Sequence, residues 1–332
     1  MNQIAIIGAG SWGTALAVIA ARAGHDVRLW SRNADVVRSI NEARINSRYL
    51  SSTSIPSGVI ATGDLGEALH GASMVVFAAP SHATRELLTA MSTILDEAAI
   101  IVSVSKGIEI ESGKRISEIA REVLGNHYSF VCLSGPSFAK EVVAGHPTAI
   151  VAASRDPTAA RTVQSDFSFE NIRIYTNTDV IGTEIGGSVK NVMAIAAGMT
   201  SGLGFGANSV AALITRGLAE ITRLARREGA QVETLMGLAG LGDLVLTCTG
   251  TLSRNRFVGE ELGKGKTLAE ITAALNEVAE GINTARAVKK LADRAGLEMP
   301  ITNEVNAVLY DGKPAPDAVA ELMSRPLREE IN

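Results

Sequence analysis

The sequence has few aromatic residues and only two cysteines, and each shortage narrows the functions open to the chain. Phe, Trp and Tyr make up 4% of the 332 residues, too few for the aromatic surfaces on which single-stranded nucleic acids stack. Cys132 and Cys248 each lie in an apolar stretch, and neither has a second cysteine at CxxC spacing. We therefore expect no disulfide scaffold and no metal site, and two isolated cysteines fit a reducing cytoplasm.

The chain also lacks an excess of positive charge and long hydrophobic segments. Its formal net charge is -4 and no block of Lys and Arg stands out, whereas nucleic-acid-binding proteins are usually basic. No uninterrupted apolar run reaches the roughly 20 residues of a membrane-spanning helix. No charged segment precedes the first apolar run, so no signal peptide is expected. These features predict neither a nucleic-acid partner nor a membrane span.

The first half of the chain, by contrast, alternates short apolar runs with helical patterns, as strand–helix–strand units of a mostly parallel sheet do. After Asp179 the pattern becomes helical and rich in alanine, with no convincing strand. We predict an α/β fold with a Rossmann-type dinucleotide-binding domain at residues 1–180 and an all-α substrate domain at 181–332. The expected strands are Gln3–Ile7, Asp26–Trp30, Met74–Ala78, Ile100–Val104, Ser129–Leu133, Thr148–Ala152 and Ile172–Tyr175.

A glycine-rich segment directly follows the first expected strand and opens an expected helix. Residues 8–13, GAGSWG, fit the pattern GxGxxG. Gly8 permits a tight turn, Gly10 lets the backbone approach a pyrophosphate, and Gly13 lets helix and strand pack closely. The helix N-terminus offers N–H groups to the phosphates. An ordinary glycine-rich turn would have the same composition, but the position at the start of a strand–helix–strand unit favours dinucleotide binding.

The residues after the second expected strand indicate which dinucleotide is preferred. An acidic residue there would bind the ribose 2′-hydroxyl of NAD and repel the 2′-phosphate of NADP. The chain instead has Arg32, whose forked guanidinium suits a phosphate. We predict that NADPH is preferred and that NADH remains possible. The alternative is that Arg32 is only a surface cation.

Two further segments follow expected strands, at the edge of the sheet where ligands bind in open α/β folds. Lys106 lies in SVSKGI, residues 103–108, directly after one strand. Gly135 and Ser137 lie in SGPSFA, residues 134–139, after another strand, and would offer backbone N–H and hydroxyl groups. The placement of these three residues predicts contacts with a ligand.

A lysine surrounded by small residues lies on the long helix expected after residue 180. Residues three and four apart share a helix face, and Lys190 shares its face with Gly186, Gly187 and Ala194. Two glycines inside a helix cost roughly 1 kcal/mol each relative to alanine, which points to close approach by another backbone or a ligand. Lys190 would then be partly desolvated and suited to proton transfer. The alternative is tight helix packing, with the ammonium group extended into solvent.

Two later segments supply the remaining polar candidates. The three glycines of GLAGLGD, residues 237–243, predict a loop with left-handed positions. Asp243 ends this segment among apolar neighbours and needs a partner, for which Lys190 is a candidate; alternatively, Asp243 caps a helix. In SRN, residues 253–255, the serine would cap a helix whose first turn carries the arginine, which makes a suitable phosphate site.

Taken together, these segments resemble the bacterial-type NAD(P)-dependent glycerol-3-phosphate dehydrogenases over nearly the whole chain. That family is also similar to the 6-phosphogluconate dehydrogenases in its helical C-terminal domain. The resemblance implies a cytoplasmic enzyme that reversibly reduces dihydroxyacetone phosphate to sn-glycerol 3-phosphate. The product would supply phospholipid synthesis. The motifs that carry it are GAGSWG at 8–13, SVSKGIE at 103–109, SGPSFAKEV at 134–142, EIGGSVKNVMAIAAG at 184–198, GLAGLGDLVLTCTG at 237–250 and SRNRFVG at 253–259.

By position, the resemblance implies a catalytic group in which Lys190 transfers the proton and Lys106 and Asp243 assist it. The family often has a second basic residue after Arg32, where this chain has Asn33, which weakens the case for strict NADP preference. The implied cofactor-binding residues are Gly8, Gly10, Ser11, Trp12, Gly13, Arg32, Lys106, Ala139, Arg254, Val278 and Glu280. The implied substrate-binding residues are Lys106, Gly135, Ser137, Lys190, Asp243, Ser253, Arg254 and Asn255.

Two other functions fit part of this pattern. A reductase of the same architecture acting on a keto acid or β-hydroxy acid would share the cofactor loop and the helix lysine, with less need for Arg254 and Asn255. A non-catalytic NADP sensor would bind the dinucleotide but would not need Lys106, Lys190 and Asp243 together. The sequence leaves the oligomeric state open; a homodimer would bury one face of the alanine-rich helical domain.

Overall fold

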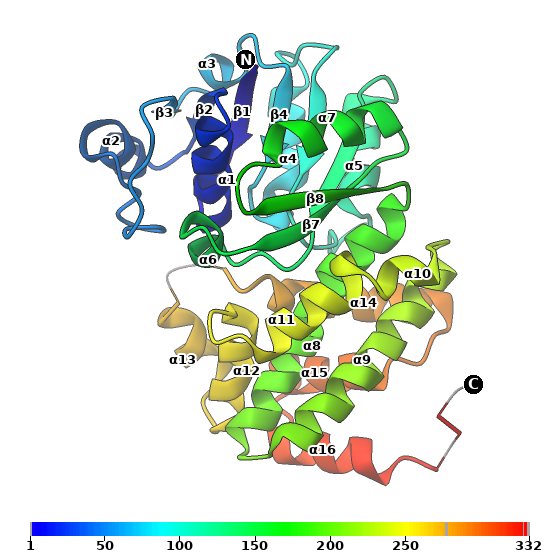
Figure 1. Ribbon diagram of the computed structural model, residues 1–332. Helices are drawn as coiled ribbons and strands as arrows, with labels where there is room; N and C mark the ends of the chain where they lie inside the picture. The colour runs from blue at the N-terminus through cyan, green and yellow to red at the C-terminus, as the bar shows by residue number, and fades with distance from the viewer. Residues whose placement is uncertain (1, 276–277, 328, 331–332) are drawn as a thin grey trace.

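The computed structural model describes residues 2–275, 278–327 and 329–330, and it consists of a sheet-based part and a helical part (Figure 1). Among these residues, eight strands form one sheet in the order β3-β2-β1-β4-β5-β6-β7-β8. All neighbouring strands run parallel except β6 and β7, so the expected mostly parallel sheet is confirmed. The strands are β1 Gln3–Ile7, β2 Asp26–Trp30, β3 Val59–Thr62, β4 Met74–Phe77, β5 Ile100–Ser103, β6 Phe130–Ser134, β7 Thr148–Ala153 and β8 Ile172–Asn177.

Helices cover both faces of the sheet, and the strand sequences reflect this. In β1, Ile4 and Ile6 pack on one face with residues of α1, α2, α6 and α7, while Ala5 and Ile7 pack on the other with residues of α3, α4 and α5. A strand that is buried on both sides needs an unbroken apolar run. These helices are α1 Ser11–Arg22, α2 Ala34–Ala43, α3 Leu65–Leu69, α4 Thr84–Met91, α5 Ile116–Leu124, α6 Ala139–Val143 and α7 Pro157–Phe167, with a 3-10 turn η1 at Ser81–Ala83.

The helical part is built around α8, which begins at Val180 and is buried along almost its whole length. In the part of the chain that the structure describes, no strand follows Asn177, which confirms the expected all-α second part. Helices α9, α11, α12, α14 and α15 all pack against α8 (Figure 1). The elements are α8 Val180–Gly202, α9 Ala207–Arg227, α10 Val232–Leu235, a π-helical turn η2 Leu238–Gly242, α11 Asp243–Thr249, α12 Arg254–Gly263, α13 Leu268–Ala273, α14 Glu280–Ala295, α15 Pro300–Tyr310 and α16 Ala315–Ser324.

The α8 and α12 backbones pack directly against each other because glycines line their contact. A Cβ atom at Gly198 of α8 would lie 2.0 Å from the carbonyl oxygen of Arg256, and one at Gly259 of α12 would lie 1.9 Å from that of Ile195. Real Cβ atoms do not approach this closely, so the contact requires glycine on both helices. The contact fixes the start of α12 relative to the middle of α8.

One stretch, Val232–Thr249, has the length and apolar composition of a membrane span, with a mean hydropathy of 1.3 over 18 residues. In the structure this stretch is divided among α10, η2 and α11. All three pack against α8, and the stretch carries the buried carboxylate of Asp243. Its apolar character therefore reflects the core of the helical part.

Candidate active site

One buried carboxylate joins the two lysines that the sequence predicts as catalytic. The Nζ atom of Lys190 donates a hydrogen bond to Oδ1 of Asp243 at 2.6 Å, and Nζ of Lys106 donates to Oδ2 at 2.7 Å. Asp243 is 1% exposed and Lys190 is 6% exposed, whereas the side chain of Lys106 is 20% exposed. These three residues are at least 53 positions apart in the sequence, and they form one charged cluster. Lys106 is its most exposed member.

Burial changes the acidity of Lys190. Desolvation lowers its pKa from the ordinary value of 10.5 to about 8. The charge of Asp243 opposes this fall in pKa, and the charge of Lys106 adds to it. The alternative in which the ammonium group extends into solvent is wrong. A lysine with a pKa near 8 can both give and take a proton close to neutral pH.

The two glycines before Lys190 explain how the cluster assembles. A Cβ atom at Gly186 would lie 2.7 Å from the carbonyl oxygen of Ala239 in η2. One at Gly187 would lie 2.7 Å from Ser134 Oγ and 3.7 Å from Cγ of Lys106. The glycines therefore let η2 and the side chain of Lys106 approach α8, as the sequence predicts for close approach by another part of the chain.

The expected left-handed loop at residues 237–243 is wrong. Gly237 and Gly242 have φ angles of -92° and -59°, and the segment forms the π-helical turn η2 that continues into α11. Its glycines serve close packing, because a Cβ atom at Gly240 would lie 2.1 Å from the carbonyl oxygen of Leu235. Asp243 is the first residue of α11, and the N-cap position belongs to Gly242. The helix-cap alternative for Asp243 is therefore wrong, and its carboxylate is directed to the lysines.

Thr247 is a member of the cluster that the sequence reasoning missed. Lys190 Nζ donates to its Oγ1 atom at 2.7 Å, and that hydroxyl donates to the carbonyl oxygen of Asp243 at 2.7 Å. Thr247 lies four residues after Asp243, and this spacing on a helix places both on one face. Once Asp243 is proposed on a helix, the spacing alone would have identified Thr247.

The glycine-rich segment at the end of β1 fits a dinucleotide. Gly8 has a φ angle of +123°, and a Cβ atom there would lie 2.7 Å from the carbonyl oxygen of Ala78. At Gly13 a Cβ atom would lie 1.9 Å from the carbonyl oxygen of Gly8, whereas at Gly10 it would meet no atom within 4 Å. Gly10 is the N-cap of α1, with no side-chain cap and no acidic residue in the first turn. Open space beside uncapped N–H groups suits a pyrophosphate.

The remaining predicted cofactor residues come from the sheet-based part and from the helical part. Arg32 is exposed directly after β2, and Asn33 caps α2 by accepting bonds from two backbone N–H groups. Glu280, at the start of α14, accepts a bond at 3.1 Å from the backbone N–H of Ser81, which follows β4. The others are Ser11, whose hydroxyl donates to the carbonyl of Tyr49 at 2.9 Å, partly buried Trp12 and Ala139, and exposed Val278.

The predicted substrate residues fall into two groups. Gly135 and Ser137 follow β6, and the carbonyl oxygen of Gly135 accepts bonds from Lys106 Nζ at 3.3 Å and from Ser137 Oγ at 3.0 Å. The second group, residues 253–255, starts α12, where Ser253 caps the helix as expected and Arg254 is exposed. The first group thus adjoins the lysine cluster, and the second offers a helix N-terminus with a cation.

Asn255 has a more internal position than the sequence suggests. Its side-chain amide donates to Oδ1 of Asn191 at 3.0 Å, and its own Oδ1 atom accepts from the backbone N–H of Gly281 at 2.9 Å. Asn191 directly follows Lys190 and was not predicted as a site residue. This network ties α8, α12 and α14 together next to the lysine cluster. Within the described ranges, no group of three His, Cys, Asp or Glu residues could hold a metal ion.

Comparisons with known proteins agree over both parts of the chain. Residues 3–160 match the family model for the NAD-dependent glycerol-3-phosphate dehydrogenase N-terminus, and residues 179–320 match the model for its C-terminus. A glycerol-3-phosphate dehydrogenase (NAD(P)+) from Koribacter versatilis is 53% identical over 100% of this chain and 99% of its own length. One from Geobacillus thermodenitrificans is 48% identical over 100% and 97%, respectively.

Solved structures show the same relationship. The crystal structure of glycerol-3-phosphate dehydrogenase from Coxiella burnetii matches with a TM-score of 0.95 and 41% identity, over 98% of this chain and 99% of that one. A ketopantoate reductase from Ralstonia eutropha matches with a TM-score of 0.61 and 18% identity, over 96% and 99%. The second likeness shows that the fold is shared and carries no argument about the substrate.

Proposed function

This chain belongs to the NAD-dependent glycerol-3-phosphate dehydrogenase family, and on that premise we propose how its own residues carry out the reaction. It is an NAD(P)-dependent oxidoreductase that reversibly reduces dihydroxyacetone phosphate to sn-glycerol 3-phosphate, a precursor of phospholipids. The observation that carries the proposed mechanism is the cluster of Lys190, Asp243 and Lys106. It contacts the segments that follow β5 and β6, on the same edge of the sheet as the glycine loop after β1.

Lys190 is the proton donor in the reducing direction. A reduced nicotinamide held at the glycine loop would supply a hydride to the C2 ketone, and negative charge would then develop on the ketone oxygen. The Lys190 ammonium stabilises that charge and donates its proton, as a general acid and a preorganised cation together do. Asp243 orients the ammonium through the 2.6 Å bond, and Lys106 adds positive charge on the exposed side of the cluster. In the oxidising direction, neutral Lys190 takes the proton back.

The substrate phosphate binds at the start of α12. The Ser253 side chain accepts from the backbone N–H of Arg256, and the exposed Arg254 guanidinium lies at the positive end of the helix. A helix N-terminus and a guanidinium together make a good phosphate site. Binding energy from the phosphate then holds C2 in place, which lowers the barrier through proximity. Contact between α8 and α12 through Gly198 and Gly259 fixes the spacing between phosphate site and proton donor.

The cofactor lies along the glycine loop, and Arg32 selects NADPH over NADH. In support, Arg32 is exposed directly after β2, and Asn33 is engaged as the cap of α2. Replacing Arg32 by alanine should lower kcat/KM for NADPH by roughly tenfold or more and leave that for NADH nearly unchanged. The control is Arg161→Ala on α7, which also removes an exposed guanidinium and should leave the cofactor ratio as it is. An unchanged ratio in Arg32→Ala would show that Arg32 is only a surface cation.

The experiment that tests the proposed function is an NADPH-oxidation assay with dihydroxyacetone phosphate against a panel of keto acids. Turnover confined to dihydroxyacetone phosphate supports the proposal, and faster turnover of a keto acid would favour the rival reductase. Binding of NADPH with no turnover of any carbonyl compound would favour a dinucleotide sensor.

The organisation of the protein completes the proposal. We propose a dinucleotide-binding domain at residues 1–180, a substrate domain at 181–332, a cytoplasmic location and a homodimer. The helical part exposes the apolar side chains Met236, Leu252 and Phe257, which are 54%, 41% and 42% exposed, respectively, and which an interface between two copies would bury. Light scattering coupled to gel filtration would test the dimer, and a monomer at micromolar concentration would refute it.

A further inference from the structure

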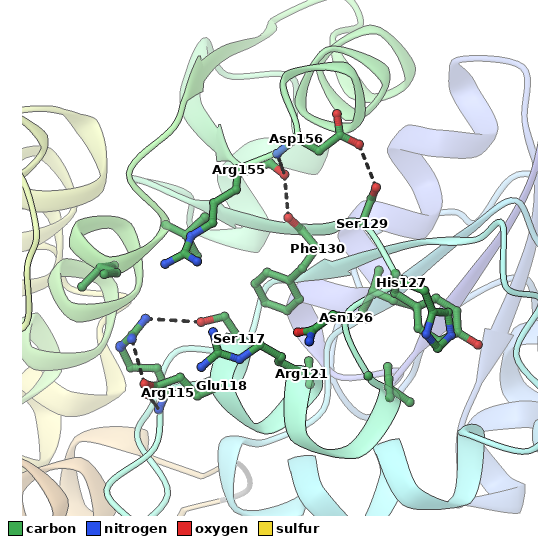
Figure 2. A pocket seen from close by; sticks show the side chains of 18 residues that line it. Arg115, Ser117, Glu118, Arg121, Asn126, His127, Ser129, Phe130, Arg155 and Asp156 are labelled. Atoms are coloured by element: carbon green, nitrogen blue, oxygen red, sulfur yellow. Dashed lines mark hydrogen bonds and ion pairs between the residues drawn. The ribbon is translucent and has the colours of Figure 1, made fainter.

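A pocket lies apart from the candidate active site, between α5, the beginning of β6, the turn after β7 and the first turn of α8 (Figure 2). Its volume is about 570 Å³, within the range in which proteins hold small ligands. None of Lys106, Lys190 and Asp243 lines it. A molecule bound here would touch neither the lysine cluster nor the glycine loop.

Three arginines line this pocket, two from the start and middle of α5 and one from the turn after β7, and in Figure 2 their side chains extend toward the same hollow. They are Arg115 immediately before α5, Arg121 on α5 and Arg155 after β7. Arg121 and Arg155 are exposed, and within the described part of the chain neither guanidinium has a hydrogen bond or ion pair. Two unengaged guanidinium forks facing one hollow offer directed donors to an oxyanion.

Arg115 adds a buried donor to the pocket wall. It is 8% exposed and pairs with Glu184 at 2.9 Å and with Glu118 at 3.0 Å. Its Nε atom nevertheless has no hydrogen-bond partner among the described residues. The Nε atom is itself closed off from solvent, so the guanidinium donors that a ligand can reach without competition are those of Arg121 and Arg155.

The carboxylates near the pocket are engaged with other groups. Glu118 pairs with Arg115. Asp156 accepts bonds from Ser129 Oγ at 2.7 Å and from the backbone N–H of Thr158 at 2.9 Å, and these bonds hold the pKa of its carboxyl below the usual value. Neither carboxylate pairs with Arg121 or Arg155. Recognition of an anion here therefore depends on directed donors and not on a large net charge.

The rest of the lining is apolar and comes from both parts of the molecule. Phe130 and Leu124 belong to the sheet-based part, and the ring of Phe130 lies beside the arginines in Figure 2. Val180 and Ile181 belong to the first turn of α8, the helix that carries Lys190. A ligand that fills the pocket would thus contact both parts at their junction.

We propose that this pocket binds a small organic molecule that carries a phosphate or carboxylate group on an apolar body. The anionic group lies between Arg121 and Arg155. The apolar body rests on Phe130 and the start of α8. This is a second ligand site, and it is independent of the proposed reaction.

Calorimetric titration of the protein saturated with NADPH and sn-glycerol 3-phosphate, so that the proposed substrate phosphate site is filled, tests this proposal. Phenyl phosphate and benzoate are the anionic probes, and phenol is the matched neutral probe. The pocket variant is Arg121→Ala/Arg155→Ala. Its control, Arg226→Ala/Arg227→Ala at the end of α9, removes the same number of exposed charges away from the pocket. We expect saturable binding of at least one anionic probe, weakened by about tenfold or more in the pocket variant and unchanged in the control. Phenol should bind more weakly than either anion.

Three outcomes would overturn the proposal. They are equal affinity in the wild type and the pocket variant, an equal loss in the control variant, and no saturable binding of either anionic probe to the wild type. Dehydrogenase activity of each variant shows that it is folded. If the double variant is not folded, Arg155→Glu carries the same expectation, because one reversed charge at this exposed position should also weaken the binding by about tenfold.

Discussion

Replacing Asp243 by asparagine should separate the electrostatic role of this residue from its shape. The carboxylate is 1% exposed and is the shared partner of two ammonium groups, at 2.6 Å and 2.7 Å. Asparagine keeps the size of the side chain but leaves Lys190 and Lys106 close together without a counter-charge. Breaking a buried ion pair from one side typically costs about 3–5 kcal/mol. Lys190 can avoid most of this cost by releasing its proton.

The expected kinetic effect follows from that release. At about 1.4 kcal/mol per pH unit, a loss of about 3 kcal/mol moves the protonation midpoint of Lys190 about two pH units lower. The pKa of Lys190 in the native protein is about 8, so the amine is mostly protonated at pH 7 in the wild type and mostly neutral in the variant. Combined with lost orientation, reduction of dihydroxyacetone phosphate at pH 7 should slow by roughly 10²–10³-fold.

The assay is the pH dependence of kcat/KM for dihydroxyacetone phosphate, followed by NADPH oxidation. In the reducing direction only the protonated amine is active, so the wild-type rate should fall as pH rises through about 8. In Asp243→Asn that fall should occur about two pH units lower, and residual activity should increase toward pH 6. The exposed Asp293→Asn on α14 is the control and should leave the profile unchanged. A variant that keeps the wild-type midpoint would refute the reasoning.

Three further changes test other parts of the structure. Gly10→Ala adds a Cβ atom that meets no protein atom within 4 Å, so the melting temperature should stay within about 2 °C of the wild-type value. The KM for NADPH should nevertheless rise at least about tenfold, because the added atom would occupy the space of the pyrophosphate. An unaffected KM would place the pyrophosphate elsewhere. Gly259→Ala places a Cβ atom 1.9 Å from the carbonyl oxygen of Ile195. Chemical denaturation should therefore show that the free energy of unfolding falls by about 3 kcal/mol or more. A fall of less than about 1 kcal/mol would show that α12 moves freely on α8. Arg254→Ala should raise the KM for dihydroxyacetone phosphate about tenfold or more, with a smaller change in kcat. The control Arg226→Ala should change neither constant. A normal KM in Arg254→Ala would show that the substrate phosphate does not bind at the start of α12.

The sequence predicts the parts of the molecule in which the local pattern of apolar residues and glycines matches the tertiary packing. Apolar runs of four or five residues identify strands such as β1 and β4, which are buried on both faces. The glycine pattern at residues 8–13 identifies the tight turn after β1. The conflict between a helical pattern and the glycines at 186 and 187 indicates close approach of another segment. Lys190 could be paired with Asp243 on the same basis, because each is an ionisable group in an apolar stretch.

Other features depend on tertiary contacts that leave little local signal. The edge strand β3, Val59–Thr62, was missed because it has four residues and pairs with one neighbour. The segment at residues 237–242 looks like a flexible loop in sequence, yet packing against α8 holds it as a π-helical turn. Asn191 was missed because its partner, Asn255, is 64 residues away. Neither propensity nor periodicity reports such a distant hydrogen bond.

The central claim is that the amine of Lys190 supplies the proton. It is tested most directly by comparing the pH profiles of kcat/KM for dihydroxyacetone phosphate in the wild type and in Lys190→Ala. We expect a wild-type profile that falls above a midpoint of about 8, and a variant that is at least roughly 10²-fold slower, shows no such fall and binds NADPH normally. A Lys190→Ala protein that keeps near-normal turnover and the same fall above pH 8 would contradict the claim.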